Sequence, residues 1–75
     1  MFDKRDLKRR RKIEAMRNKF KKGQVLGRED FKAEGFSDIG TQNALLELKG
    51  KYAMDLLTVY RGKILIGWIL ASEVL

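Results

Sequence analysis

The hydrophobic positions change their spacing along the chain and divide it into three parts. The first part, residues 1–22, has four apolar side chains close to one helical face: Leu7, Ile13, Met16 and Phe20. This spacing predicts a helix that Asp3 caps at its start and that Gly23 ends. The second half of this helix is expected to pack on the rest of the protein.

The second part, residues 25–51, predicts two helices joined by a turn. Residues 24–26 form a short extended segment, too short for more than one or two ladder hydrogen bonds. A helix over residues 28–34 follows, with Phe31 as its main buried side chain. Gly35 breaks this helix, and Phe36 is expected to fill the turn.

Ser37 is a suitable N-cap for a third helix over residues 38–49, which Gly50 ends. Its expected buried stripe has helical spacing and consists of Thr41, Ala44, Leu45 and Leu48.

The third part, residues 53–70, has a period of two and predicts a β-hairpin. Strands over 53–60 and 63–70 are joined by Arg61-Gly62, since glycine suits a tight turn that needs positive φ. This loop pairs Val59 with Ile64, Leu57 with Ile66, and Asp55 with Trp68. One face is then expected in the core: Leu57, Val59, Ile64, Ile66 and Trp68. The other face is too apolar for water alone, and we expect the first helix or a partner to cover it: Met54, Leu56, Thr58, Tyr60, Leu65, Gly67 and Ile69.

Positive charge is concentrated in the first part. Residues 1–22 contain eleven Lys or Arg against three Asp or Glu, a net charge of +8, whereas residues 23–75 have a net charge of −1. A basic segment of this kind attracts polyanions, because each neutralised phosphate releases condensed counterions. Nucleic acid is the first interpretation; an acidic protein partner and a solvated helix face are the alternatives.

Composition argues against several classes of function. The chain has no His and no Cys, so an ordinary zinc site, a disulfide and most nucleophile–base pairs are excluded. We therefore expect neither an enzyme nor a cofactor-binding or metal-binding protein. The longest apolar run, residues 64–71, is far shorter than the roughly 20 residues of a membrane-spanning helix, so we expect a cytoplasmic protein.

The order of predicted elements resembles the winged helix-turn-helix family of DNA-binding proteins, over about residues 10–70. The resemblance lies in the Leu26-Gly27-Arg28-Glu29-Asp30-Phe31 segment, the Gly35-Phe36-Ser37 turn, the Ala44-Leu45-x-x-Leu48 stripe and the Tyr60-Arg61-Gly62-Lys63 hairpin tip. It implies an α+β fold of three helices with a C-terminal two-stranded wing.

The same resemblance implies a set of contacts to duplex DNA. The third helix enters the major groove in this family, and the wing tip reaches a phosphate or the minor groove. Because the third helix carries Asp38 and Glu47, the basic first helix is expected to supply most of the affinity. The expected DNA-binding residues are Lys8, Arg9, Arg10, Arg11, Lys12, Ser37, Asp38, Gln42, Asn43, Lys49, Arg61 and Lys63.

The favoured function is therefore a small DNA-binding transcriptional regulator of the kind that phages and mobile elements encode. It is expected to form a homodimer through the second, apolar hairpin face. The alternative is a protein-interaction module, an inhibitor or adaptor, whose basic helix docks on an acidic partner. A basic helix lying on an anionic membrane is a third and weaker hypothesis, because the stripe has no Trp and little Leu.

Overall fold

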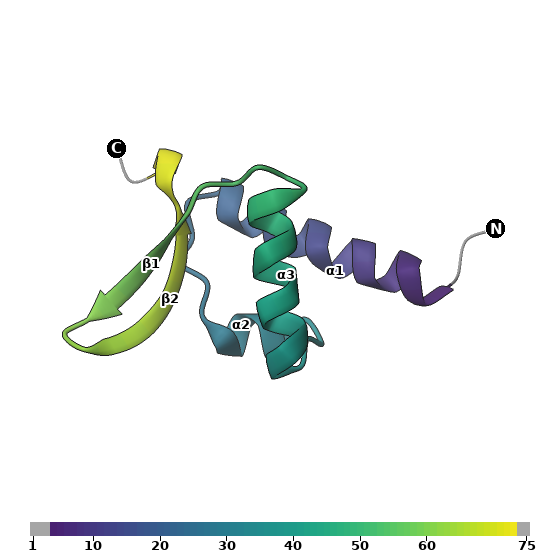
Figure 1. Cartoon of the computed structure of the whole chain (residues 1–75), viewed down its shortest axis with the longest axis horizontal. Helices are drawn as coiled ribbons and strands as arrows, with labels where there is room; N and C mark the ends of the chain where they lie inside the picture. The colour runs from purple at the N-terminus through teal and green to yellow at the C-terminus, as the bar shows by residue number, and fades with distance from the viewer. Residues whose placement is uncertain (1–3, 74–75) are drawn as a thin grey trace.

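The computed structural model describes residues 4–73 and has an α+β fold, three helices followed by one antiparallel hairpin (Figure 1). The predicted order of elements is confirmed. Asp3, expected to cap the first helix, lies outside the described residues. The elements are α1 (Lys4–Lys21), α2 (Arg28–Ala33), α3 (Asp38–Gly50), β1 (Leu56–Arg61), β2 (Ile64–Leu70) and a short 3₁₀ turn (Ala71–Glu73).

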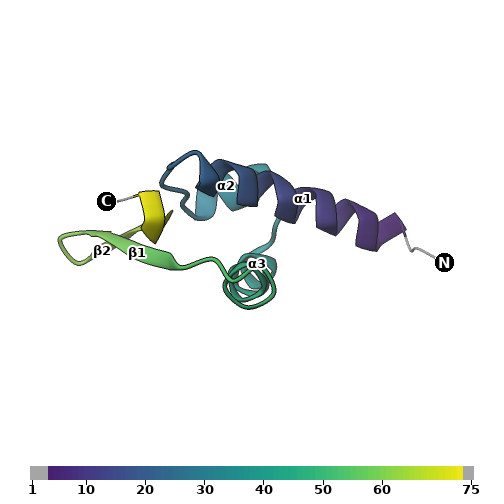
Figure 2. The ribbon, with the colours of Figure 1, turned by 90° about the horizontal axis from the view of Figure 1, so that it is seen from above.

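Helix α1 has two halves with different surroundings. Its second half buries Ile13, Met16 and Phe20, the stripe that the sequence predicts. Residues 4–11 are all exposed, and this half extends beyond the other elements (Figures 1 and 2). Only the second half is therefore held in place by burial of apolar surface, which is the dominant stabilising term in folding.

Phe31 of α2 lies at the centre of the core. Its ring is fully buried, and the nearest aromatic rings come from three other segments. The ring centroids lie 6.3 Å from Phe20, 5.7 Å from Phe36 and 6.0 Å from Trp68. These tilted and edge-on contacts are the geometry that aromatic pairs favour, so one side chain joins α1, the α2–α3 turn and β2.

Leu26 forms an isolated antiparallel β-bridge with Trp68 of β2. Its backbone N–H donates to the Trp68 carbonyl, and the Trp68 N–H donates to the Leu26 carbonyl, both at 2.9 Å. Two glycines allow this close approach. A Cβ at Gly67 would lie 2.4 Å from the Leu26 carbonyl oxygen, and a Cβ at Gly27 would lie 2.6 Å from the Ile66 carbonyl oxygen.

The hairpin begins later than predicted and turns at a different place. Ala53 has φ of 50°, in the left-handed region, so it belongs to the loop after α3 rather than to a strand. The turn is Gly62-Lys63, with Gly62 at φ of 64°, and not Arg61-Gly62. The predicted pairing is therefore wrong; near the tip Arg61 pairs with Ile64.

The predicted faces of the hairpin are also wrong, because β2 contains a bulge at Ile66. Tyr60 pairs with Leu65 but Val59 pairs with Gly67, so Ile66 has no partner opposite it. An extra residue reverses the alternation of side chains along a strand. Trp68 therefore lies on the same face as Thr58, whereas it was expected on the face of Leu57.

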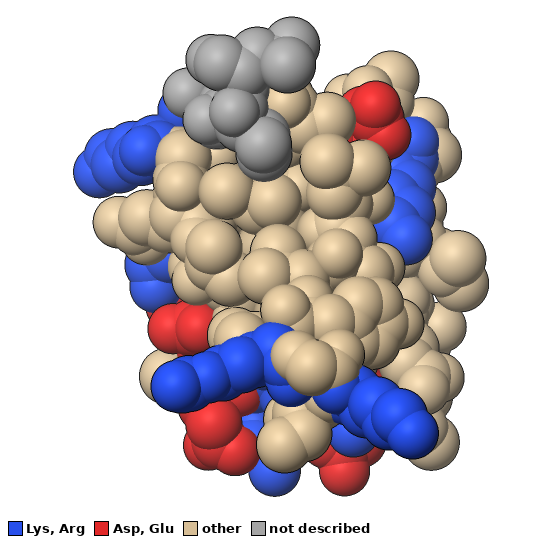
Figure 3. Space-filling model, turned by 90° about the vertical axis from the view of Figure 1, so that its left-hand side faces the viewer, with Lys and Arg blue, Asp and Glu red and all other residues tan. Residues whose placement is uncertain are grey.

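The core face of the hairpin is consequently the one that we expected the first helix or a partner to cover. Leu56 and Trp68 are buried and Leu65 and Leu70 pack against the core. The expected core side chains Leu57, Ile64 and Ile66 are 44%, 72% and 45% exposed. The hairpin end of the molecule shows a continuous surface of uncharged residues, with charged side chains mainly at its borders (Figure 3).

Candidate nucleic-acid interface

The strongest concentration of charge in the structure is the basic segment, defined here as residues 4–12 of α1. It contains seven Lys or Arg and one acidic residue, Asp6, and all of it except the half-buried Lys12 is exposed. A helix places consecutive residues about 100° apart, so these cations lie all around α1 rather than along one line. The segment therefore offers positive charge in several directions at the free end of the helix.

One side of the basic segment faces the start of α3. Side chains of Lys8, Arg9 and Lys12 line a shallow groove together with Ser37. The remaining residues that line this groove are Arg5, Gly35, Phe36 and Gly40. Five expected DNA-binding residues are adjacent in sequence on α1, and the fold brings three of them together with Ser37.

Lys12 and Arg9 are held by contacts within the protein. The Lys12 ammonium donates to the Gly35 carbonyl at 3.3 Å and lies 5.8 Å from the centre of the Phe36 ring. Arg9 forms an ion pair with Glu47 of α3. These contacts tie α1 to the α2–α3 turn and to α3, so both side chains have a structural use in addition to any contact with a ligand.

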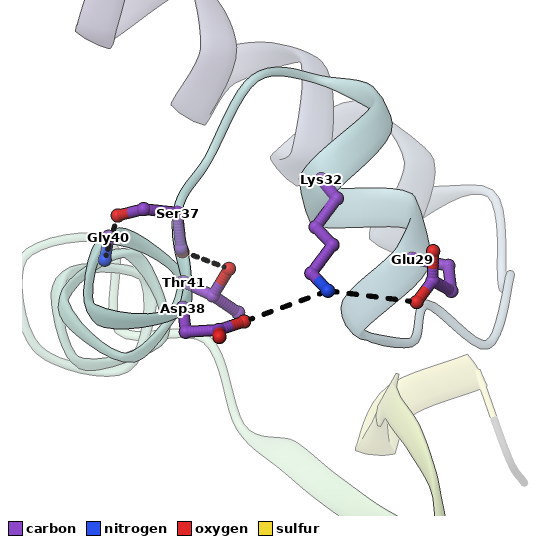
Figure 4. Close-up of polar contacts among 6 residues, drawn as sticks. All are labelled: Glu29, Lys32, Ser37, Asp38, Gly40 and Thr41. Carbon is purple, nitrogen blue, oxygen red and sulfur yellow. Dashed lines mark hydrogen bonds and ion pairs between the residues drawn. The ribbon is translucent and has the colours of Figure 1, made fainter.

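Ser37 acts as the helix cap that the sequence predicts. Its hydroxyl oxygen accepts a hydrogen bond from the Gly40 N–H at 3.0 Å, and its carbonyl accepts one from the Thr41 hydroxyl at 2.8 Å (Figure 4). The adjacent Asp38 carboxylate lies 4.0 Å from the Lys32 ammonium, which is also 3.9 Å from Glu29. Lys32 thus offsets part of the negative charge at the start of α3.

Amides and aliphatic groups make up the outward side of α3 from Ile39 to Leu46. Ile39 and Leu46 are 73% and 68% exposed, and Gln42 and Asn43 are exposed with them. We call these four residues the α3 ridge. The two amides were expected as site residues, whereas the two aliphatic residues were not. A signal for them exists in the sequence, since both fall outside the buried stripe of Thr41, Ala44, Leu45 and Leu48.

The remaining expected site residues lie elsewhere. Lys49 is exposed near the end of α3, and Arg61 and Lys63 are exposed at the tip of the hairpin. The hairpin tip and the free end of α1 lie at opposite ends of the molecule, whose longest dimension is 45 Å (Figure 1). The fold therefore does not bring the basic segment and the hairpin tip into one site.

Two other features that would point to a different function are absent from the described residues. Among residues 4–73 no group of three or more His, Cys, Asp or Glu side chains is arranged to hold a metal ion. No helix within the same range is long and apolar enough to cross a membrane. Comparison of the chain with protein-family models, characterised proteins and solved structures found no match.

Proposed function

We propose that this protein binds duplex DNA, as a small regulator of the winged-helix kind that its order of elements resembles. The observation that carries the proposal is the basic segment, with seven cations on an exposed helical end and one acidic residue among them. Most hydrogen bonds between proteins and DNA go to phosphate and sugar, and these contacts dominate affinity. The basic segment supplies this part of the binding energy.

The α3 ridge supplies contacts to base edges. Asn43 and Gln42 carry an amide donor and acceptor, the pair that fits the N6 and N7 positions of adenine in the major groove. Ile39 and Leu46 place exposed aliphatic groups beside them, and apolar side chains contact the thymine methyl group. Because the ridge has no Lys or Arg to bind guanine, this chemistry favours A·T pairs.

The shape of the molecule fits a duplex longer than one helical turn. The long axis of 45 Å exceeds the 34–36 Å of a turn of B-form DNA. α3 lies between the basic segment and the hairpin tip along this axis (Figure 1). In the proposed complex α3 occupies the major groove, and the basic segment contacts phosphates beside it.

The first test is fluorescence anisotropy with random duplex DNA over a range of salt concentrations. The test variant replaces Lys4, Lys8 and Arg11 with Ala, because none of the three has an ion pair with another residue of the described part. The control variant removes the same amount of charge from the other end of α1 and from the loop after α3: Lys21→Ala, Lys22→Ala and Lys51→Ala.

The expected result is micromolar or tighter binding to wild type that weakens steeply with salt. Each lost phosphate contact lowers the slope of log K against log salt by about 0.9, so the test variant should lose up to about 2.7 from the slope. The control should lose much less. Equal losses of slope in both variants would show that net charge alone, and not the position of the basic segment, determines the salt dependence. No binding at low salt would refute the proposal and favour an acidic protein partner.

The role of the α3 ridge has its own test. Duplexes rich in A·T pairs are compared with the same duplexes containing uracil, which lacks only the methyl group of thymine. Wild type should bind the thymine duplex more tightly, and the Ile39→Ala, Leu46→Ala variant should bind the two alike. Equal binding of wild type to both duplexes would exclude thymine contacts and leave the role of the basic segment intact.

A further inference from the structure

The outer face of the hairpin is an apolar surface that the described part of the fold leaves uncovered. Cross-strand partners share a face of a sheet, which assigns Leu57 and Ile69 to this side, together with Val59 and Ile64. Val25 lies on the same side, because the alternate residue Leu26 points into the core. With Ile66 at the bulge, we define the outer face as Val25, Leu57, Val59, Ile64, Ile66 and Ile69.

Four of these six side chains are exposed to an extent that water does not favour, and Val59 and Ile69 are half-buried. Ile64 is 72% exposed, and Val25, Leu57 and Ile66 are between 42% and 45% exposed. Scattered apolar residues are common on protein surfaces, but a contiguous aliphatic face indicates a binding surface. The core does not need this face, because the opposite side of the same hairpin packs on Phe31 and its neighbours.

We propose that the outer face binds the outer face of a second copy of this chain, in a two-fold symmetric dimer. A two-fold interface joins the same patch on both copies, so the patch must be complementary to itself. The borders of this face carry charges of both signs. Arg61 and Lys63 lie at the hairpin tip, and Glu29 and Asp30 line a groove together with Val25 and Ile66.

Antiparallel packing of two hairpins places apolar side chains against apolar side chains and opposite charges against each other. The aliphatic side chains of the two copies meet in the middle of the interface. The cationic tip of each hairpin then lies towards the start of α2 in the other copy, where the Glu29 side chain is 90% exposed. A central apolar area with charged borders is the usual anatomy of a protein interface.

A dimer also adds stability that a chain of this small size otherwise lacks. A domain of about 60 residues buries only about 60% of the surface of its unfolded chain, and this one has no cysteine for a disulfide. Association adds apolar burial that the single chain lacks. An aliphatic face does not suit DNA phosphates, so this interface leaves the basic segment and the α3 ridge available for a ligand.

Sedimentation velocity of the whole chain, without DNA, tests the proposal from about 1 to 200 μM, the micromolar range of weak and moderate complexes. The test variant is Ile64→Glu. The control is Leu46→Glu, which places the same charge at an equally exposed aliphatic position on α3. Circular dichroism of both variants checks that the helices are retained. A second test variant, Arg61→Glu with Lys63→Glu, examines the charged borders without changing an apolar residue.

Wild type and Leu46→Glu should both be dimers, and Ile64→Glu should raise the dissociation constant by about 30-fold or more, the effect of losing one dominant interface side chain. The tip variant should also weaken the dimer, and Glu29→Lys should restore part of the lost affinity. A monomeric wild type at 200 μM overturns the proposal. A dimer that Ile64→Glu leaves intact, or that Leu46→Glu disrupts, also overturns it. The same holds for a monomer that binds anionic lipid vesicles in a flotation assay. Because DNA is absent, each of these outcomes is separate from the fate of the proposed function.

Discussion

Replacement of Gly67 by Ala tests the close approach between β2 and the Leu26 segment. A Cβ at this position would lie 2.4 Å from the Leu26 carbonyl oxygen, 2.7 Å from its carbonyl carbon and 2.9 Å from the Gly27 Cα. All three atoms belong to the backbone, so no side-chain rotation can relieve the overlap. We expect the Leu26 segment to be displaced from β2.

The expected loss of stability follows from the contacts that this displacement breaks. Two backbone hydrogen bonds join Leu26 to Trp68, and each contributes about 0.5–1.5 kcal/mol net. Leu26 is also 2% exposed, and exposing a buried leucine costs about 1.5–3 kcal/mol. The sum of about 2.5–6 kcal/mol is a large part of the 5–15 kcal/mol that is usual for small domains.

Thermal unfolding followed by circular dichroism measures the effect. Since 1 kcal/mol shifts the Tm of a domain of this size by about 4–8 °C, Gly67→Ala should lower the Tm by at least about 10 °C. Gly50→Ala is the control, because a Cβ there has no atom within 4 Å, and it should be neutral or stabilising by up to about 1 kcal/mol. A Gly67→Ala protein whose Tm lies within about 2 °C of wild type would refute the close approach.

Three further substitutions have expected outcomes. Phe31→Ala empties the centre of the aromatic cluster and should cost about 3–5 kcal/mol in a urea titration, and a loss below about 1 kcal/mol would contradict the central role of this ring. Ser37→Ala removes the cap of α3 and should cost about 1 kcal/mol while the DNA affinity at low salt is retained; a weaker affinity at an unchanged salt slope would mean that the hydroxyl contacts DNA. Glu47→Gln releases Arg9, so DNA binding should tighten and the salt slope should steepen by about 0.9 in anisotropy measurements. Weaker binding would show instead that the ion pair holds α1 in the orientation that binding needs.

The helical part of the fold could be predicted from the sequence because its signals are local. The stripe of Thr41, Ala44, Leu45 and Leu48 is buried as predicted, since helical spacing alone decides which residues share a face. Ser37 caps α3 because a hydroxyl before a helix is close to the free N–H groups of its first turn. Each of these predictions depends on residues within one or two helical turns.

The hairpin could not be predicted to the same detail. A strand alternates regularly only while no extra residue enters its ladder, and the bulge at Ile66 moves Trp68 to the opposite face. Aromatic contact with Phe31 and the bridge to Leu26 accompany this change, and both join residues far apart in the chain. The sequence correctly predicted that one face of the hairpin is buried, but of the side chains expected on that face only Trp68 is in the core.

In the candidate site, too, some features follow from the sequence and others depend on the tertiary structure. The basic segment is a property of the sequence, because its cations are consecutive residues and a protruding helix leaves them exposed. The ion pair between Arg9 and Glu47 joins residues 38 positions apart, and only the packing of α1 on α3 brings them together. The fold likewise separates the hairpin tip from the basic segment by most of the length of the molecule.

The sequence by itself thus determined the elements, the cap, the buried helical stripe and the position of the charge, all of which depend on short-range spacing. The tertiary structure decided which face of the hairpin is buried, which cations have partners and which aliphatic residues remain exposed. The physical reason is that a helix satisfies its backbone hydrogen bonds within one segment. A hairpin obtains its register and its buried face from partners elsewhere in the chain.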